Sequence, residues 1–343
     1  MSPRRSTGGE QDVLAATDGW FMRHGLPYFV PEQRREARSA VRLGRTVPLM
    51  LLTGLVAVAA GVLLGMLAQQ LALGTATLVT VGLLAATWYA LTAMRARPIV
   101  RWALDRTFGS LRTLLPMMSR ALPLLLLFVT FLFINAEVWE VSADLDGGVL
   151  WLVALLFVLL AVGFLLVRLP EEVDQVDDDV DDALLRRACR GTPLEADCER
   201  LLAEGADVRA HVEVTGFERW NLVAVLLIIQ AAQVLLLAGT VFVFFMVFGS
   251  MVMNPGIVEN WTGETVRVMP LPWLQNITTE LVQVSVFLAA FSCLYLTVST
   301  VTDDTYRAQF FGSVLAELER AVGMRAVYLA LRAEPQPEPG PGR

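Results

Sequence analysis

The stretch that decides the fold class lies at residues 221–249 and reads NLVAVLLIIQAAQVLLLAGTVFVFFMVFG, without a single charged side chain. A helix needs about 20 mostly apolar residues to cross the roughly 30 Å of hydrocarbon in a bilayer. The whole chain of 343 residues is 55% hydrophobic and 18% charged, whereas soluble domains average about 45–50% and about 25%. This balance excludes a disordered chain, a nucleic-acid binder with a basic face and an ordinary soluble enzyme. It predicts an integral membrane protein.

Five further runs are long and apolar enough to be membrane spans, and none carries Arg, Asp or Glu in its central third. They are Val47–Ala68, Leu71–Met94, Ala121–Val141, Gly148–Val167 and Glu280–Val301. The sequence therefore predicts an all-α fold, a polytopic membrane helical bundle of six transmembrane helices plus cytoplasmic amphipathic helices.

The orientation of these spans follows from the basic residues, all 27 of which are Arg. Every Arg but one lies in the N-terminal arm, in 95–120, in 168–220 or after residue 301. The three alternate connections hold only Arg267. Cytoplasmic loops of membrane proteins carry the excess of positive residues. Both termini and the large loops are therefore expected in the cytoplasm, and no cleavable secretory signal is expected.

The parts of the chain outside the spans have distinct compositions. The N-terminal arm at 1–46 contains an aromatic segment at 18–31, and an acidic loop with a short helix pair follows the first four spans at 169–220. The four-span unit 47–168 includes an interfacial helix at 95–120, and the two-span unit 221–301 includes an outer loop at 250–279. The chain ends with an amphipathic helix at 302–332 and a disordered tail at 333–343. The aromatic segment is expected on the membrane surface or docked beneath the bundle. The Arg-rich segments are expected to attract anionic lipid headgroups.

Several stretches resemble those of known membrane proteins. They are Gly19-Trp-Phe-Met-Arg-His-Gly-Leu-Pro-Tyr-Phe29, Glu218-Arg-Trp-Asn-Leu-Val223, the Gln230/Gln233 pair and Val298-Ser-Thr-Val-Thr-Asp-Asp-Thr-Tyr-Arg307. Over most of its length the chain is similar to uncharacterised multi-pass membrane proteins of actinobacteria. The resemblance implies one membrane domain in the bacterial inner (cytoplasmic) membrane, and it implies no activity, cofactor or residue role.

Polar residues within the spans are the candidate functional residues. Glu137 lies near the outer end of the third run, beside Asn135, while Gln230 and Gln233 share one face of the fifth run and Ser292 lies in the sixth. Ionisable and polar groups at membrane depth point to an ion or substrate pathway. The alternatives are a water-exposed interfacial carboxylate at Glu137 and helix–helix hydrogen bonds elsewhere, each worth about 0.6 kcal/mol.

Small residues recur along three spans at helical spacing. Gly61 and Gly65 belong to a seam in the first run, Gly82 belongs to one in the second, and Ser285 and Ser299 belong to one in the sixth. Small side chains let two backbones approach closely within a membrane. These residues are therefore expected to mark packed helix faces.

The sequence carries no motif that indicates catalysis, a cofactor or a metal. The acidic run at 171–182 lacks the Gly and the final Glu of a calcium loop, so whether it binds a cation stays open. The favoured hypothesis is a non-enzymatic scaffold or regulatory membrane component. The alternative is an oligomeric ion channel or passive transporter with a polar-lined pathway, and homo-oligomerisation is left open. Nucleic acid is not expected as a partner.

Overall fold

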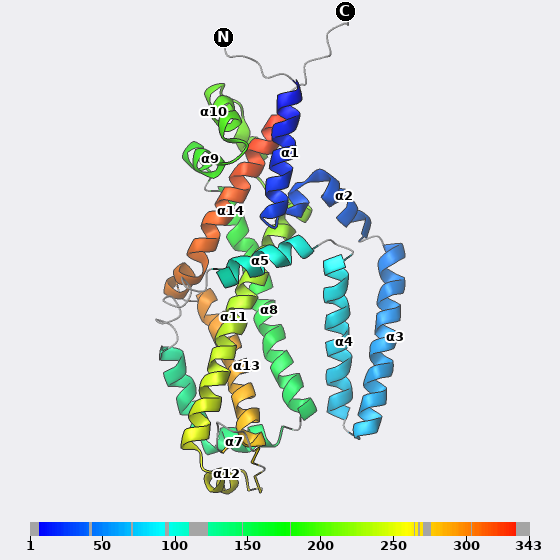
Figure 1. Cartoon of the computed structure of the whole chain (residues 1–343), viewed down its shortest axis with the longest axis vertical. Helices are drawn as coiled ribbons and strands as arrows, with labels where there is room; N and C mark the ends of the chain where they lie inside the picture. The colour runs from blue at the N-terminus through cyan, green and yellow to red at the C-terminus, as the bar shows by residue number, and fades with distance from the viewer. Residues whose placement is uncertain are drawn as a thin grey trace, which may run out of the picture.

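The protein is almost entirely helical in the computed structural model (Figure 1). The structure describes residues 7–40, 43–69, 71–92, 96–109, 123–145, 147–178, 180–263, 265–266, 268–269, 276–302 and 304–333. Within these residues no strand forms, and Val268 and Thr278 make a single isolated bridge. The second half of the predicted helix 95–120 and nearly all of the predicted tail 333–343 lie outside the described residues.

Among the residues that the structure describes, four helices are long and apolar enough to cross a membrane. They are α4 (Leu71–Thr92), α8 (Gly147–Asp178), α11 (Gly216–Val252) and α13 (Thr279–Thr302). α11 and α13 form the centre of the bundle, with α8 against both of them. α4 packs on α8, and α3 (Leu43–Ala68) packs on α4 at the edge of the molecule (Figure 1).

The predicted third span, Ala121–Val141, is not one continuous helix. A helix over Pro123–Phe133 and α7 (Ala136–Ala143) are bent by 75° relative to each other. The cause is Asn135, whose extended backbone ends one helix while its side chain accepts a hydrogen bond from the backbone N–H of Glu137 and so caps the next. The Trp139 indole donates to the Phe133 carbonyl at 2.6 Å and satisfies a group that the break exposes. The bent pair counts as a fifth candidate span only if both helices belong to one span.

One end of the bundle is formed by α7, by α12 (Pro255–Thr262) and by the turn between α3 and α4 (Figure 1). We call it the α7/α12 end. The Gln283 side chain donates to the Leu145 carbonyl at 2.9 Å and ties α13 to the loop after α7. Gly148 lets α8 reach the start of α4, because a Cβ at this position would lie 2.5 Å from the Leu73 nitrogen.

The opposite end carries the remaining helices, and we call it the α1/α14 end (Figure 1). Its elements are α1 (Thr7–Arg23), η1 (Pro27–Phe29), α2 (Pro31–Ala40), α5 (Arg97–Gly109), α9 (Asp182–Cys189), α10 (Glu195–Ala203), η2 (Val208–His211) and α14 (Asp304–Ala333). The predicted aromatic segment docks here, with Trp20, Phe21, Tyr28 and Phe29 all buried. α14 is buried around its whole circumference from Ala321 to Tyr328, rather than on one side.

The acidic run is mostly paired within the described residues. α8 continues beyond the predicted span end at Val167 to Asp178, supported by ion pairs from Arg168 to carboxylates one turn ahead. Arg219 of α11 contacts Asp174 at 2.6 Å. Asp181 accepts a hydrogen bond from the Leu184 N–H and caps α9. This part of the run therefore ties α8 to α11 and caps α9.

Candidate functional site

A buried ion pair joins α11 to α14. The guanidinium of Arg325 donates to one carboxylate oxygen of Glu218, from Nη2 at 2.7 Å and from Nε at 3.1 Å. Glu218 is only 3% exposed and Arg325 only 6%. Burying two charges costs several kcal/mol each unless the pair has good geometry and its remaining groups are hydrogen-bonded. The two-pronged contact meets the first condition.

The remaining groups of this pair are also engaged. Arg325 Nη1 donates to the carbonyls of His211 at 2.8 Å and Glu213 at 3.1 Å, which lie in the segment just before α11. The second oxygen of Glu218 lies 3.0 Å from Nη1 of Arg34 in α2, which makes an ion pair but no hydrogen bond. A single charged cluster thus holds α2, α11, α14 and the loop before α11 in one arrangement. We call Arg34, Glu218 and Arg325 the ion cluster.

Asn221 fixes the N-terminal arm one turn further along α11. Its fully buried amide donates to the Gly25 carbonyl at 2.8 Å, and its carbonyl accepts from the Tyr28 N–H at 3.0 Å. Gly25 has a φ of 71°, and a Cβ there would lie 3.1 Å from the Cβ of Trp102 in α5. The turn between α1 and η1 therefore requires glycine both for its backbone conformation and for its contact with α5.

The two chain-terminal helices contact each other directly. The Tyr328 hydroxyl in α14 donates to the Asp18 carboxylate in α1 at 2.7 Å, and Arg332 donates to the same hydroxyl oxygen at 2.9 Å. Burial raises the pKa of Asp18 above its usual value, against the lowering effect of the Tyr328 hydrogen bond. Phe21 packs edge-on against Tyr328 and extends this contact into the core.

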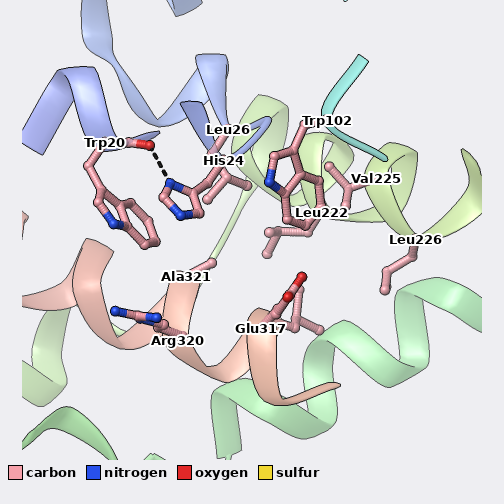
Figure 2. A pocket seen from close by; sticks show the side chains of 11 residues that line it. Trp20, His24, Leu26, Trp102, Leu222, Val225, Leu226, Glu317, Arg320 and Ala321 are labelled. Carbon is pink, nitrogen blue, oxygen red and sulfur yellow. Dashed lines mark hydrogen bonds between the residues drawn. The ribbon is translucent and has the colours of Figure 1, made fainter. Parts of the chain in front are cut away.

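A cavity of about 110 Å³ lies beside the ion cluster, between α1, α5, α11 and α14 (Figure 2). Its walls are mostly apolar, with two indole rings, one imidazole and two charged side chains. The lining residues are Trp20, His24, Leu26, Trp102, Leu222, Val225, Leu226, Glu317, Leu318, Arg320 and Ala321. A small apolar enclosure with a few convergent polar groups is the usual form of a small-molecule site.

The charged groups of this cavity are partly engaged by their surroundings. Glu317 pairs with Arg106 of α5 at 2.6 Å through one oxygen. Arg320 donates to the Ala188 carbonyl at 3.3 Å and to the Arg190 carbonyl at 3.1 Å, and it lies over the Trp20 ring at 5.6 Å. In Figure 2 its guanidinium is on the Trp20 side, away from Glu317. The positive charge of Arg320 is thus held at one edge of the cavity.

His24 enters the cavity as a neutral ring. Burial lowers the pKa of His24, and the nearby Arg320 lowers it further. Its Nδ1 lies 2.8 Å from the Trp20 carbonyl oxygen, and since that oxygen only accepts, Nδ1 carries the proton. The other ring nitrogen is then a hydrogen-bond acceptor. The imidazole is stacked on Trp20 with ring centroids 3.7 Å apart.

The polar residues predicted to line a pathway lie elsewhere, and the structure does not bring them into one site. Gln230 and Gln233 are buried in α11, and the two side-chain polar atoms of Gln230 have no hydrogen-bond partner among the described residues. Ser292 is buried in α13 and donates to the Leu288 carbonyl of its own helix. Asn135 and Glu137 are exposed at the α7/α12 end, where they form the cap of α7.

Of the predicted packing residues, Gly61 and Gly65 lie where α3 crosses α4 closely, whereas Ser285 and Ser299 lie along α13. A Cβ on Gly61 would lie 2.7 Å from the Gly74 carbonyl oxygen, and Gly65 approaches Gly74 from the next turn of α3. Ser285 is fully buried in α13, whereas Ser299 is half-buried. Gly61 and Gly74 thus form the contact point of α3 and α4.

The residues of the ion cluster and the cavity were not identified from the sequence. One signal for them was present, because Arg325 is a lone charge in the apolar stretch Val322–Leu331 of α14 and such charges are rarely buried unpaired. Its partner Glu218 lies 107 residues away. No protein-family model, no curated protein and no solved structure matches this chain.

Proposed function

We propose that this chain is a non-enzymatic integral membrane protein of the bacterial inner membrane that acts as a scaffold or regulatory component. The observation that carries the proposal is the ion cluster. Glu218 and Arg325 are buried against each other and against backbone carbonyls, and the half-buried Arg34 pairs with Glu218, so the cluster does not face an open cleft. Such an arrangement favours a fixed structural junction between the membrane helices and the helices at the α1/α14 end.

Six membrane crossings fit the contacts better than five. α1 precedes every span and α14 follows every span, yet Tyr328 bonds to Asp18. Contact between these helices requires an even number of crossings between them. α3 supplies the missing crossing, because its 26 residues extend over about 39 Å at 1.5 Å per residue. It starts after α2, whose Arg34 contacts Glu218, and ends at the α7/α12 end beside α4.

The α1/α14 end is the cytoplasmic one in this proposal. The described Arg side chains lie in the helices of this end or in the last turns leading into it, and the positive-inside rule assigns such an end to the cytoplasm. α9 and α10 then present charged side chains to the cytoplasm, among them exposed Arg186, Arg187, Glu195 and Glu199. This charged surface suits recognition of a protein partner.

A passive channel is the second candidate, and one observation favours it. A buried amide without partners is costly, and the Gln230 side chain makes no hydrogen bond with the described residues. A polar lining of this kind would suit a water-filled path in another conformation. In the present structure Gln230 is only 1% exposed.

Ion flux from reconstituted vesicles separates the two candidates. The scaffold proposal predicts that vesicles with the full chain conduct no more than empty vesicles, over a range of voltages and of monovalent and divalent cations. Flux that Gln230→Leu abolishes would instead support the channel. Glu137→Gln provides a second test, since in a cation pathway the variant should conduct cations less selectively than the wild type at low salt, and this difference should shrink as salt screens the remaining charges.

A further inference from the structure

Two hydrogen-bond acceptors, on Glu317 and His24, line the cavity in Figure 2 together with donor groups on Trp20, Trp102 and Arg320. The second carboxylate oxygen of Glu317 is buried and accepts no hydrogen bond from the residues that the structure describes. The acceptor nitrogen of His24 lies on the opposite wall (Figure 2). A buried acceptor that is left without a donor costs about 1–3 kcal/mol, and more when it is charged. The site therefore favours a ligand that brings N–H groups.

The other lining residues indicate that the ligand is a cation with an apolar part. Trp20 and Trp102 supply aromatic surface on either side of His24. Three aliphatic side chains of α11 complete the lining, namely Leu222, Val225 and Leu226. Indole rings attract cations through their electron-rich faces, and because Trp20 already meets His24 and Arg320, such a contact would fall to Trp102. Arg320 adds a positive charge, but two of its nitrogens donate to backbone carbonyls and its guanidinium lies on the Trp20 side of the cavity, away from Glu317 (Figure 2).

The size and position of the cavity limit the ligand further. Its 110 Å³ is somewhat smaller than the roughly 150 Å³ apolar cavity that holds one benzene molecule. The side chain of Glu317 keeps 33% of its surface exposed, which leaves a way in. The aliphatic lining residues belong to the first turns of the apolar stretch of α11. The cavity therefore lies at the edge of the apolar bundle that faces the α1/α14 end.

We propose that this cavity binds a primary ammonium group on a short stem, with the ammonium between Glu317 and His24 and the stem against the indole rings. Two sources share this chemistry, namely a small free amine and the ethanolamine headgroup of a phospholipid. Binding would join α1, α5, α11 and α14, and would therefore stabilise the docked N-terminal arm. The inference goes beyond the scaffold proposal and does not require it.

Thermal unfolding and calorimetry of the full chain in detergent test the free-amine source, with propylamine as a probe smaller than benzene. We expect propylamine to raise the unfolding temperature. Propanol and propyltrimethylammonium should bind at least about tenfold more weakly, because the first lacks the charge and the second lacks N–H donors. Equal stabilisation by all three compounds would overturn the proposal.

Variants of α14 locate the binding. Glu317→Gln should weaken propylamine binding by about tenfold or more, whereas Glu319→Gln, which changes a carboxylate on the same helix outside the cavity lining, should leave it unchanged. Ala321→Leu should also abolish binding by filling the cavity, and it leaves the Glu317–Arg106 pair in place. Unchanged binding in both Glu317→Gln and Ala321→Leu would overturn the assignment.

Bilayers of defined composition test the lipid source. The chain in nanodiscs of phosphatidylethanolamine should unfold at a higher temperature than in phosphatidylcholine with the same acyl chains, and Glu317→Gln should remove the difference. A propylamine effect without this lipid effect would identify a free amine as the ligand. Absence of both effects in the wild type would refute the ammonium site.

Discussion

Replacing Arg325 with Met is expected to destabilise the protein by about 3–5 kcal/mol. The substitution leaves Glu218 buried with only Arg34 as a charged partner, and it removes the donors to the carbonyls of His211 and Glu213. Breaking a buried ion pair on one side carries a cost of this size. Thermal unfolding followed by far-ultraviolet circular dichroism would report it, and faster proteolysis of the N-terminal arm would accompany it.

Two control variants distinguish the burial of charge from the loss of a side chain. Arg186→Gln removes an arginine whose partner Glu199 is 3.4 Å away at the surface, and it should cost less than about 1 kcal/mol. The double variant Glu218→Gln/Arg325→Met leaves no unpaired carboxylate and should regain part of the lost stability. A single Arg325→Met variant as stable as the wild type would contradict the structural role of the ion cluster.

Replacing Gly61 with Leu is expected to cost about 1–3 kcal/mol through overpacking. The new Cβ would lie 2.7 Å from a backbone oxygen of α4, so the two helices must separate rather than adjust one side chain. Gly82→Leu on α4 is a matched control, since a Cβ there meets no atom within 4 Å. Equal unfolding temperatures for the two variants would show that the α3–α4 crossing does not depend on the Gly61 contact.

The sequence predicted the elements that depend on local composition. Uninterrupted apolar runs predicted the helices α4, α8, α11 and α13, because helical spans need only length and hydropathy. The bend at Asn135 was missed. An Asn followed by Glu two residues later is typical of a helix start, but it stands inside an apolar run that satisfied the length rule.

The candidate site could not be predicted in the same way, because its contacts join distant segments. Gly25 meets Asn221 across 196 residues, and Asp18 meets Tyr328 across 310. Neither pair leaves a local pattern, and the aromatic arm alone permitted both a surface position and a docked one. The polar residues that hydropathy singled out, such as Gln230 and Glu137, lie apart from this site.

Labelling of single cysteines with a membrane-impermeant maleimide tests the central claim, namely six crossings with the α1/α14 end in the cytoplasm. The native cysteines are all buried, so the wild type provides the background. In right-side-out cells, exposed positions Gln69, Glu140 and Glu259 should react once changed to cysteine, and Glu199 should react only after the membrane is opened. Reaction of Gln69 on the same side as Glu199 would show that α3 and α4 do not cross the membrane, and would contradict the account.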